Sequence, residues 1–456
     1  MPHPLLTKPG EPARPIHLVT GDTWAALRET LPPTARRFAE AQGWEPKPGR
    51  HLLVPDGDGD VAAILVGLDA ADPFAVGALP RALPEGVYRF DAAPPDAGLA
   101  ALAWCLGGYS FTRYKARADR PARLVVPEGV DAEEVARIAA AVAMGRDLVN
   151  TPANDLTPEG IEEAARALAE RHGAVATAIV GDDLLAANLP MIHAVGRASV
   201  TPPRLVDLTW GEEGAPGVTL VGKGVAFDTG GLDIKPSAAM LLMKKDMGGA
   251  AAALALADMV MGAGLPVRLR VLIPAVENAI SGSAFRPGDI LPSRKGLSVE
   301  IGNTDAEGRL ILADALALGC EAAPDLLIDF STLTGAARVA LGPDLPALFT
   351  ADDGLAADLS RLGLAVADPV WRLPLWAPYA ATLDSKVADI NHVSSGPFAG
   401  SITAALFLAR FAEGARAYAH LDLYAWNPKP RPGRPEGGEV QTARAVYALL
   451  KERYGT

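Results

Sequence analysis

Residues 218–261 read VTLVGKGVAFDTGGLDIKPSAAMLLMKKDMGGAAAALALADMVM, and this stretch sets the expected architecture. It begins with a short apolar run, Val218–Val221, which is typical of a buried strand. A glycine-rich segment follows, and the stretch ends in an Ala-rich run, Met247–Met261, which favours a helix. A strand, a glycine-rich loop and a helix in this order are typical of an α/β sheet that binds its ligand beyond the strand ends.

A helix is expected at Pro158–His172, before this stretch, and the same alternation of strands and helices continues toward the C-terminus. Strand candidates and helix candidates follow one another at Val267–Ile273, Gly308–Ala323, Leu326–Phe330, Gly400–Phe411, Ala419–Leu423 and Gln441–Tyr454. Strands that alternate with helices predict a largely parallel sheet that is covered by helices on both faces. We therefore expect an α/β catalytic domain with a mostly parallel central sheet over residues 153–456.

The first 127 residues show a second, smaller pattern of the same kind. Strand-like runs separate Ala-rich stretches with helical spacing at Leu52–Pro55, Val61–Leu68 and Arg123–Val126. This predicts a smaller N-terminal α/β domain, residues 1–127. From Asp131 the sequence DAEEVARIAAAVAMGRDLVN has acidic residues in its first turn and apolar residues at helical spacing. We expect a connecting helix within residues 128–152.

Composition narrows the class of protein. The 456 residues are 49% hydrophobic and 21% charged, values typical of a folded globular chain. Lys plus Arg is 42 and Asp plus Glu is 54, so the net charge is −12, which disfavours a general nucleic-acid binder. The uncharged run Ala97–Thr112 is shorter than the about 20 residues of a membrane span. Together with an N-terminus that does not read as a signal peptide, this predicts a cytoplasmic enzyme.

The glycine-rich segment carries the first polar cluster, Lys223, Asp228 and Lys235. A phosphate-binding loop is one alternative, but a Walker loop needs Ser or Thr after its Gly-Lys pair, and Gly224 stands there. A dinucleotide-binding GxGxxG pattern fails because Phe227 occupies its last position. Nucleotide binding is therefore a minor hypothesis.

Two further polar clusters stand beside expected helices. Asp246 directly precedes the Ala-rich run, where it could simply cap the helix. The third cluster lies in NTDAEGRL, residues 303–310, where Asp305, Glu307 and Arg309 alternate. In an extended segment such residues point to one side, so they could form salt bridges or share a cation.

Taken together, the clusters favour metal ions. Four carboxylates that converge at strand ends would repel one another strongly unless cations neutralise them. Carboxylates can bridge two divalent ions about 3.5 to 4 Å apart, as they do in two-metal hydrolases. The clusters contain no histidine, and we expect His392 and His420 to be core or hydrogen-bonding residues. A GxSxG nucleophile motif is also missing from the sequence.

Five motifs in this order resemble the leucyl (cytosol) aminopeptidase family of dinuclear metallo-exopeptidases. They are VGKGVAFDTGGLDIKPS, MKKDMGGAAA, PAVENAISGSAFRPGD, NTDAEGRL and STLTGA. The resemblance extends with weaker motifs from LVNTPANDLTP, near residue 148, to the C-terminus, and says little about residues 1–127. It implies a metal-dependent aminopeptidase (EC 3.4.11) that functions in peptide turnover.

The resemblance also implies a ligand set for two divalent ions. Asp228 and Glu307 would bridge the pair. Lys223 and Asp246 would complete the tighter site, and Asp305, including its backbone carbonyl, would complete the more exchangeable one. Lys223 can be a ligand only as a neutral amine, a form that two adjacent cations favour. Zinc, manganese and magnesium all remain open as the metals.

The catalytic groups implied by the resemblance are Lys235 and Arg309. A water that bridges the two metals would attack the scissile carbonyl, and Lys235 would stabilise the oxyanion. Arg309 would hold a bicarbonate ion that accepts the proton of this water. The substrate's free amino terminus would bind one metal, which explains exopeptidase action.

By the same resemblance, Met243, Thr332 and Gly335 would line the pocket for the first side chain, and the Leu333 backbone would orient the peptide. Core packing is the alternative for Met243. The family also implies a homohexamer, a dimer of trimers.

One position departs from the family pattern. The family usually reads HLDIAG where this chain reads HLDLYA at residues 420–425, so Tyr424 replaces a small residue at the pocket wall. Tyr424 either narrows the pocket or turns outward to pack under the following loop. The preferred N-terminal residue is thus open. The rival functions are a DNA-binding or regulatory homologue and a catalytically inactive one.

Overall fold

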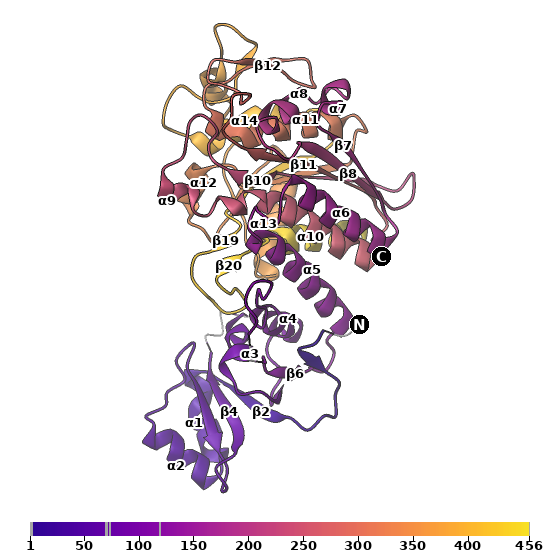
Figure 1. The fold of residues 1–456 in the computed structure, drawn as a ribbon. Coiled ribbons are helices and arrows are strands. Elements are labelled where there is room, and N and C mark those ends of the chain that lie inside the picture. The colour runs from indigo at the N-terminus through magenta and orange to yellow at the C-terminus, as the bar shows by residue number, and fades with distance from the viewer. Residues whose placement is uncertain (1–2, 69–71, 73, 118–119, 456) are drawn as a thin grey trace. The chain divides into compact units, whose positions relative to one another are not determined.

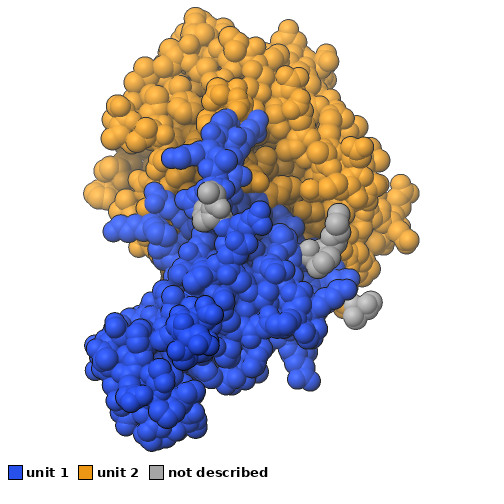
Figure 2. All heavy atoms as spheres, turned by 60° about the horizontal axis from the view of Figure 1, so that its bottom comes forward, with its two compact units in different colours: residues 1–143, 429–436 blue, residues 144–428, 437–456 orange. Residues whose placement is uncertain are grey.

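The computed structural model describes residues 3–68, 72, 74–117 and 120–455, and the chain divides into two compact units. Unit 1 comprises Met1–Ala143 and Lys429–Glu436, and unit 2 comprises Met144–Pro428 and Gly437–Thr456 (Figure 2). Both are α/β structures, as the sequence predicted.

Unit 1 contains a six-stranded sheet in the order β1-β6-β5-β2-β4-β3, in which only the β3–β4 pair is antiparallel. Its strands are β1 (Leu6–Thr7), β2 (Arg14–Val19), β3 (His51–Pro55), β4 (Val61–Gly67), β5 (Val87–Phe90) and β6 (Arg123–Val125). Its helices are α1 (Gly21–Thr30), α2 (Pro33–Ala41), η1 (Ala75–Ala78), α3 (Leu79–Ala82) and α4 (Ala97–Gly107). Helix α4 is apolar and buried over most of its length, so the uncharged run noted in the sequence is core.

Helix α5 (Ala132–Asn150) connects the units along the chain, and the boundary between Ala143 and Met144 falls inside it. Its first turn carries Glu133 and Glu134, where acidic side chains favour the positive end of the helix dipole. The connecting helix predicted from the sequence is therefore present.

Unit 2 is built on a nine-stranded sheet in the order β16-β15-β18-β14-β9-β11-β8-β7, with β10 paired to β11 (Figure 1). The central strands β18, β14, β9 and β11 run parallel, and antiparallel strands flank them on either side. The bounds are β7 (Val175–Val180), β8 (Arg204–Trp210), β9 (Gly217–Gly222), β10 (Gly224–Asp228), β11 (Arg268–Asn278), β14 (Leu326–Ser331), β15 (Ala347–Phe349), β16 (Trp371–Arg372) and β18 (Tyr418–Asp422). The predicted, mostly parallel central sheet is confirmed.

Helices cover both faces of this sheet (Figure 1). One face carries α6 (Pro158–His172) and α10 (Gly248–Ala263); α15 (Ala443–Tyr454) packs on α10, and α13 (Asp353–Ala365) packs on α15. The other face carries α8 (Pro190–Gly196), α11 (Glu307–Cys320) and α14 (Gly400–Ala409), whose apolar residues form a continuous core with the sheet. Such two-sided burial explains why the central strands are apolar throughout rather than alternating.

Short elements complete unit 2. They are α7 (Asp183–Ala186), α9 (Ser237–Met240), η2 (Met243–Met247), β12 (Ile290–Pro292), β13 (Ser298–Glu300), η3 (Thr304–Ala306), α12 (Gly335–Leu341), η4 (Ala377–Leu383), β17 (Ile390–Asn391), β19 (Trp426–Asn427) and β20 (Gly437–Gly438). The glycine-rich segment after β9 was expected to be a loop, but residues 224–228 form strand β10. This strand forms because its backbone pairs in parallel with the long strand β11.

One segment, Met243–Ala263, is long and apolar enough by composition to cross a membrane. However, 83% of its apolar window is buried inside the protein. The segment is η2 followed by α10, which packs on β9 and β14. It is therefore the core helix of unit 2.

Candidate metal centre

The polar residues that the sequence singled out meet at one edge of the central sheet, where the parallel strands end. Lys223 directly follows β9, and Asp228 is the last residue of β10. Asp246 lies in η2, Asp305 in η3, and Glu307 is the first residue of α11. We call Asp228, Asp246, Asp305 and Glu307 the carboxylate cluster; this edge is where open α/β sheets bind ligands.

Lys223 is buried between two members of the cluster. Its Nζ lies 2.7 Å from Asp246 Oδ2 and 2.9 Å from Glu307 Oε1. It also donates a hydrogen bond of 3.2 Å to the Thr332 carbonyl oxygen. Burial lowers the pKa of Lys223, but the charges of Asp246 and Glu307 outweigh this effect and hold its pKa above the usual value.

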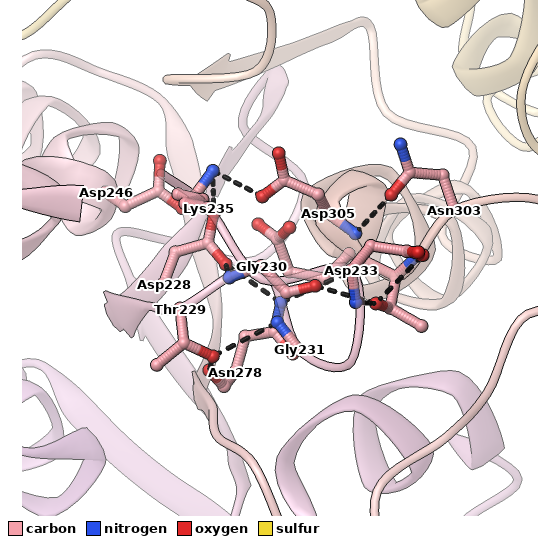
Figure 3. A network of polar contacts seen from close by, with 12 residues as sticks. Asp228, Thr229, Gly230, Gly231, Asp233, Lys235, Asp246, Asn278, Asn303 and Asp305 are labelled. Carbon is pink, nitrogen blue, oxygen red and sulfur yellow. Dashed lines mark hydrogen bonds and ion pairs between the residues drawn. The ribbon is translucent and has the colours of Figure 1, made fainter. Parts of the chain in front are cut away.

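Lys235 forms ion pairs with the other two members of the cluster, Asp228 and Asp305 (Figure 3). Its Nζ lies 2.7 Å from Asp228 Oδ2 and forms a second ion pair with Asp305 Oδ1. Asp228 Oδ1 in turn accepts hydrogen bonds from Gly230 N, at 2.9 Å, and from Asn278 Nδ2, at 2.8 Å. Asp228 is thus fixed in orientation by its own loop and by strand β11.

The oxygen atoms of the carboxylate cluster are arranged in a way that fits metal ions. One carboxylate oxygen each from Asp228, Asp305 and Glu307 lie within 4.8 Å of one another. Both Glu307 oxygens are buried with no hydrogen-bond partner among the described residues, and Oε1 has only the ion pair with Lys223. Burial, together with the charge of Asp228, raises the pKa of Glu307 well above its usual value. Buried carboxylate oxygens in this state suit hard divalent cations, so the residues fit a metal site.

The pKa of Asp305 is also raised, but to a smaller extent than that of Glu307. Burial and the Asp228 charge raise its pKa to about 6, although Lys235 opposes the shift. The extended conformation expected for NTDAEGRL is wrong, because residues 304–306 form η3 and α11 begins at Glu307. Asp305 and Glu307 still converge, since the tight turn of η3 precedes the first turn of α11.

Asp246 is not a helix cap, the simplest alternative that the sequence left open. The residue at the cap of α10 is Met247, which makes no side-chain capping bond. The Asp246 carboxylate instead faces the site, where Oδ1 accepts a 2.7 Å hydrogen bond from Thr332 Oγ1. Thr332 therefore contacts the carboxylate cluster directly.

Arg309 lies in the first turn of α11 and is buried. Its Nη1 donates a 2.7 Å hydrogen bond to the His392 carbonyl oxygen, and its Nε is buried without a hydrogen-bond partner among the described residues. Burial lowers its pKa to about 10. As expected, His392 and His420 are buried and hydrogen-bonded: His392 Nε2 lies 2.9 Å from the Asn303 carbonyl oxygen and His420 Nδ1 lies 2.8 Å from Asp329, while His420 Nε2 has no hydrogen-bond partner among the described residues.

The cluster opens into a cavity of about 490 Å³. Five residues that the sequence assigned to substrate contact line it: Met243, Thr332, Leu333, Gly335 and Tyr424. Tyr424 therefore lies at the cavity wall, not under the following loop. Lys245 and Arg338 line the cavity as well, and sequence reasoning gave them no role. Burial lowers the pKa of Lys245 to about 8.

Three supporting residues were also missed. Asn278 and Thr304 tie the glycine-rich loop to η3, because Asn278 Nδ2 donates to the Thr304 carbonyl at 3.1 Å and Thr304 Oγ1 donates to Gly230 O at 2.7 Å. Asp422, at the end of β18, accepts a 3.0 Å bond from Leu333 N and a 2.6 Å bond from Thr334 Oγ1. Each stands inside or beside a motif quoted above, but only the fold shows what it contacts.

Comparison with known proteins agrees with this geometry. Residues 143–450 match the model of the cytosol aminopeptidase family, catalytic domain, and residues 14–127 match that of the M17 aminopeptidase, N-terminal domain. A probable cytosol aminopeptidase of Syntrophotalea carbinolica is 38% identical over 445 residues, 89% of each chain. One from Roseiflexus castenholzii is 41% identical over 365 residues, 76% of this chain and 74% of the relative.

Two solved structures are also similar. The cytosol aminopeptidase of Coxiella burnetii has a TM-score of 0.94 and 45% identity, and 99% of each chain is covered. The bottromycin maturation enzyme BotP in complex with Mn has a TM-score of 0.87 and 35% identity, with 97% of this chain and 100% of that chain covered.

Proposed function

Because the chain belongs to the cytosol aminopeptidase family and is an aminopeptidase, we propose that it releases N-terminal residues from peptides with two divalent metal ions bound in its carboxylate cluster. The observation that carries this proposal is the convergence of Asp228, Asp305 and Glu307 within 4.8 Å, with the Glu307 oxygens unsatisfied. Two ions bound there would supply a Lewis acid and an activated water to the reaction.

The ligand set follows from which oxygens lie together. Asp228 and Glu307 would be shared by the two ions, as the family resemblance implies; in support, one oxygen of each lies within 4.8 Å of the other and of an Asp305 oxygen. Lys223 and Asp246, which are 2.7 Å apart, would complete one site, and Asp305, including its backbone carbonyl, would complete the other. Without metal, Lys223 and Lys235 supply the positive charge that the carboxylates need. Lys223 must lose its proton before its nitrogen can be a ligand.

Lys235 is proposed as the electrophilic residue. It lies beside Asp228 and Asp305 and lines the cavity, so its ammonium group can reach the oxygen of a carbonyl bound next to the cluster. There it would stabilise the negative charge that develops as the carbonyl is attacked.

Arg309 is proposed to hold a bicarbonate ion that accepts the proton of the attacking water. Its buried guanidinium group has an Nε without a partner among the described residues, which leaves a charged donor for an anion. Among the described residues that line the cavity there is no histidine that could act as the base instead.

Manganese is the metal we would try first, because the donor set is mostly carboxylate and the similar enzyme BotP is described in complex with Mn. Zinc and magnesium remain further candidates. We also propose a cytoplasmic enzyme that functions in peptide turnover, in line with relatives that are named cytosol aminopeptidases.

A homohexamer is proposed from the resemblance to the cytosol aminopeptidase family, and the surface of unit 2 is compatible with subunit contacts. Large apolar side chains stand exposed on several of its elements, among them Val339 at 83%, Phe398 at 83%, Leu241 at 80% and Trp371 at 60%. Exposed apolar groups of this size often mark a subunit interface. Equilibrium sedimentation would report the number of chains directly.

The function is tested with alanyl p-nitroanilide and its N-acetylated form, using enzyme that has been chelated and then supplied with Mn²⁺. We expect hydrolysis of the free substrate only, and only with metal. Cleavage of the acetylated substrate at the same rate would contradict an aminopeptidase mechanism. The rival function, DNA binding, is not favoured by a net charge of −12.

A further inference from the structure

Two cationic side chains stand over one aromatic ring in the wall of the cavity. Lys245 Nζ lies 4.6 Å from the centroid of the Tyr424 ring, and the Arg338 guanidinium carbon lies 5.1 Å from it. All three residues line the cavity that contains the carboxylate cluster. They come from η2, α12 and the segment after β18, so only the fold brings them together.

Neither cation has a carboxylate partner. Among the described residues, no hydrogen bond or ion pair is made by Lys245 Nζ or by the Arg338 guanidinium group. The nearby acids are already occupied: Asp246 lies 2.7 Å from Lys223, and Asp422 accepts from Leu333 N and Thr334. The aromatic ring alone offers the two cations a weak, partial compensation.

The two cations differ in how well water can solvate their charge. Lys245 is only 5% exposed, so its charge is poorly solvated, whereas Arg338 is exposed at the surface of α12. A buried charge without a partner is costly, and a ligand that brings the opposite charge lowers that cost. This part of the cavity is therefore suited to a carboxylate.

We propose that Lys245 and Arg338 form a subsite for an acidic side chain, glutamate or aspartate, at the N-terminal residue of the substrate. The inference rests on the proposed aminopeptidase function, because it assigns the pocket of that same site. Glutamate has an unbranched side chain that carries its charge at the tip. The carboxylate would accept charge-assisted hydrogen bonds from both cations.

The test compares substrates of equal size and different charge. The values of kcat/KM are measured for glutamyl, glutaminyl, leucyl and alanyl p-nitroanilides with the full-length, Mn²⁺-loaded enzyme. We expect a glutamyl-to-glutaminyl ratio of about 10 or more, the scale of one charge-assisted hydrogen bond. Anilides have no free C-terminal carboxylate, so such a preference can arise only from the side chain.

Variants assign the preference to its residues. Arg338→Gln, at an exposed position that does not endanger folding, should lower the glutamyl-to-glutaminyl ratio about 10-fold. Lys245→Met should lower the ratio at least as far. Arg361→Gln is the matched control, because Arg361 is exposed on α13, pairs with Glu452 and lies outside the cavity lining, so the ratio should not change.

The outcomes separate this inference from the function it rests on. Activity on leucyl or alanyl substrate with a glutamyl-to-glutaminyl ratio of one or less would overturn the acidic subsite alone. A high ratio that survives in Arg338→Gln and in a folded Lys245→Met would also overturn it. If none of the four substrates is hydrolysed by the metal-loaded enzyme, the proposed function itself is wrong.

Discussion

Gly308 packs against the side chain of Lys223 so closely that a Cβ atom at position 308 would lie 2.6 Å from Lys223 Cε and 2.7 Å from its Nζ. Lys223 cannot easily move aside, because its ammonium group is held between Asp246 and Glu307. Gly308, the glycine of NTDAEGRL, lies on α11 and does not have a positive φ. Glycine is therefore required here because a side chain would collide with Lys223, and not because of the backbone conformation.

Gly308→Ala should displace the Lys223 amine from the carboxylate cluster while the fold is kept, because alanine favours a helix over glycine. We expect weaker metal binding and a loss of turnover of about 100-fold or more, the scale of a misplaced catalytic group. Metal content and kcat are measured together, with circular dichroism as the control for folding. Wild-type metal affinity and turnover in this variant would show that the contact is not needed.

Lys235→Ala should separate metal binding from catalysis. The variant loses a cation that pairs with Asp228 and Asp305, so it should bind metal at least as tightly as the wild type. Its turnover should fall by about 10² to 10³, the usual effect of removing an oxyanion donor. If metal is lost and the remaining loaded enzyme turns over normally, Lys235 has a structural role instead.

Tyr424→Ala should widen the pocket. Tyr424 stands at the cavity wall, so its removal should raise kcat/KM for leucyl p-nitroanilide relative to the alanyl substrate by about 10-fold, the scale of one or two methylene groups. Tyr424→Phe keeps the ring and should change this ratio little. An unchanged leucyl-to-alanyl ratio in Tyr424→Ala would place the ring outside the space that the first side chain occupies.

The buried pair of Arg146 and Glu439 predicts a pH dependence of stability in unit 2. Arg146 Nη2 lies 2.8 Å from Glu439 Oε2, and Asn427 donates a further 3.0 Å hydrogen bond to that oxygen. Burial raises the pKa of Glu439, but Arg146 outweighs it and lowers the pKa from 4.5 to about 2. Since the folded-state pKa is lowered, the stabilisation is complete above pH 4.5 and is lost as the pH falls toward 2.

Glu439→Gln should therefore destabilise the protein by about 3 kcal/mol at pH 7, because it removes the carboxylate charge that faces the buried guanidinium group of Arg146. The difference between the urea midpoints of wild type and variant should shrink between pH 5 and pH 3. Glu413→Gln is a control, because Glu413 is exposed and its pair with Lys295 is screened by solvent. A difference that stays constant over this pH range would contradict the account.

Local sequence patterns predicted the architecture well where burial dictates it. The helix expected at Pro158–His172 has those bounds in the structure, because Thr157 caps its start and Gly173 ends it with a positive φ. The strands at the centre of unit 2 were visible as apolar runs, since both faces of the sheet are covered. The conformation of NTDAEGRL was missed, because a short turn before a helix has no apolar period of its own.

The sequence predicted which residues form the candidate site, but not how these residues contact one another. The motifs indicated which carboxylates to consider, and the structure brings Asp228, Asp305 and Glu307 together. The sequence could not show that Asp246 faces Lys223 instead of capping α10, because both arrangements suit the same position. Lys245 and Arg338 were missed for a similar reason: their shared contact with Tyr424 depends on the packing of three distant elements.

The number of metal ions bound per chain, measured in wild type and in Glu307→Ala after chelation and reloading with Mn²⁺, tests the central claim most directly. Wild type should bind two ions and recover its activity, while Asp305→Ala should chiefly weaken one of them. Glu307→Ala should retain neither ion tightly and should not turn over, because we propose that its carboxylate serves both sites. Two tightly held ions in Glu307→Ala, or full activity in the metal-free wild type, would contradict the account.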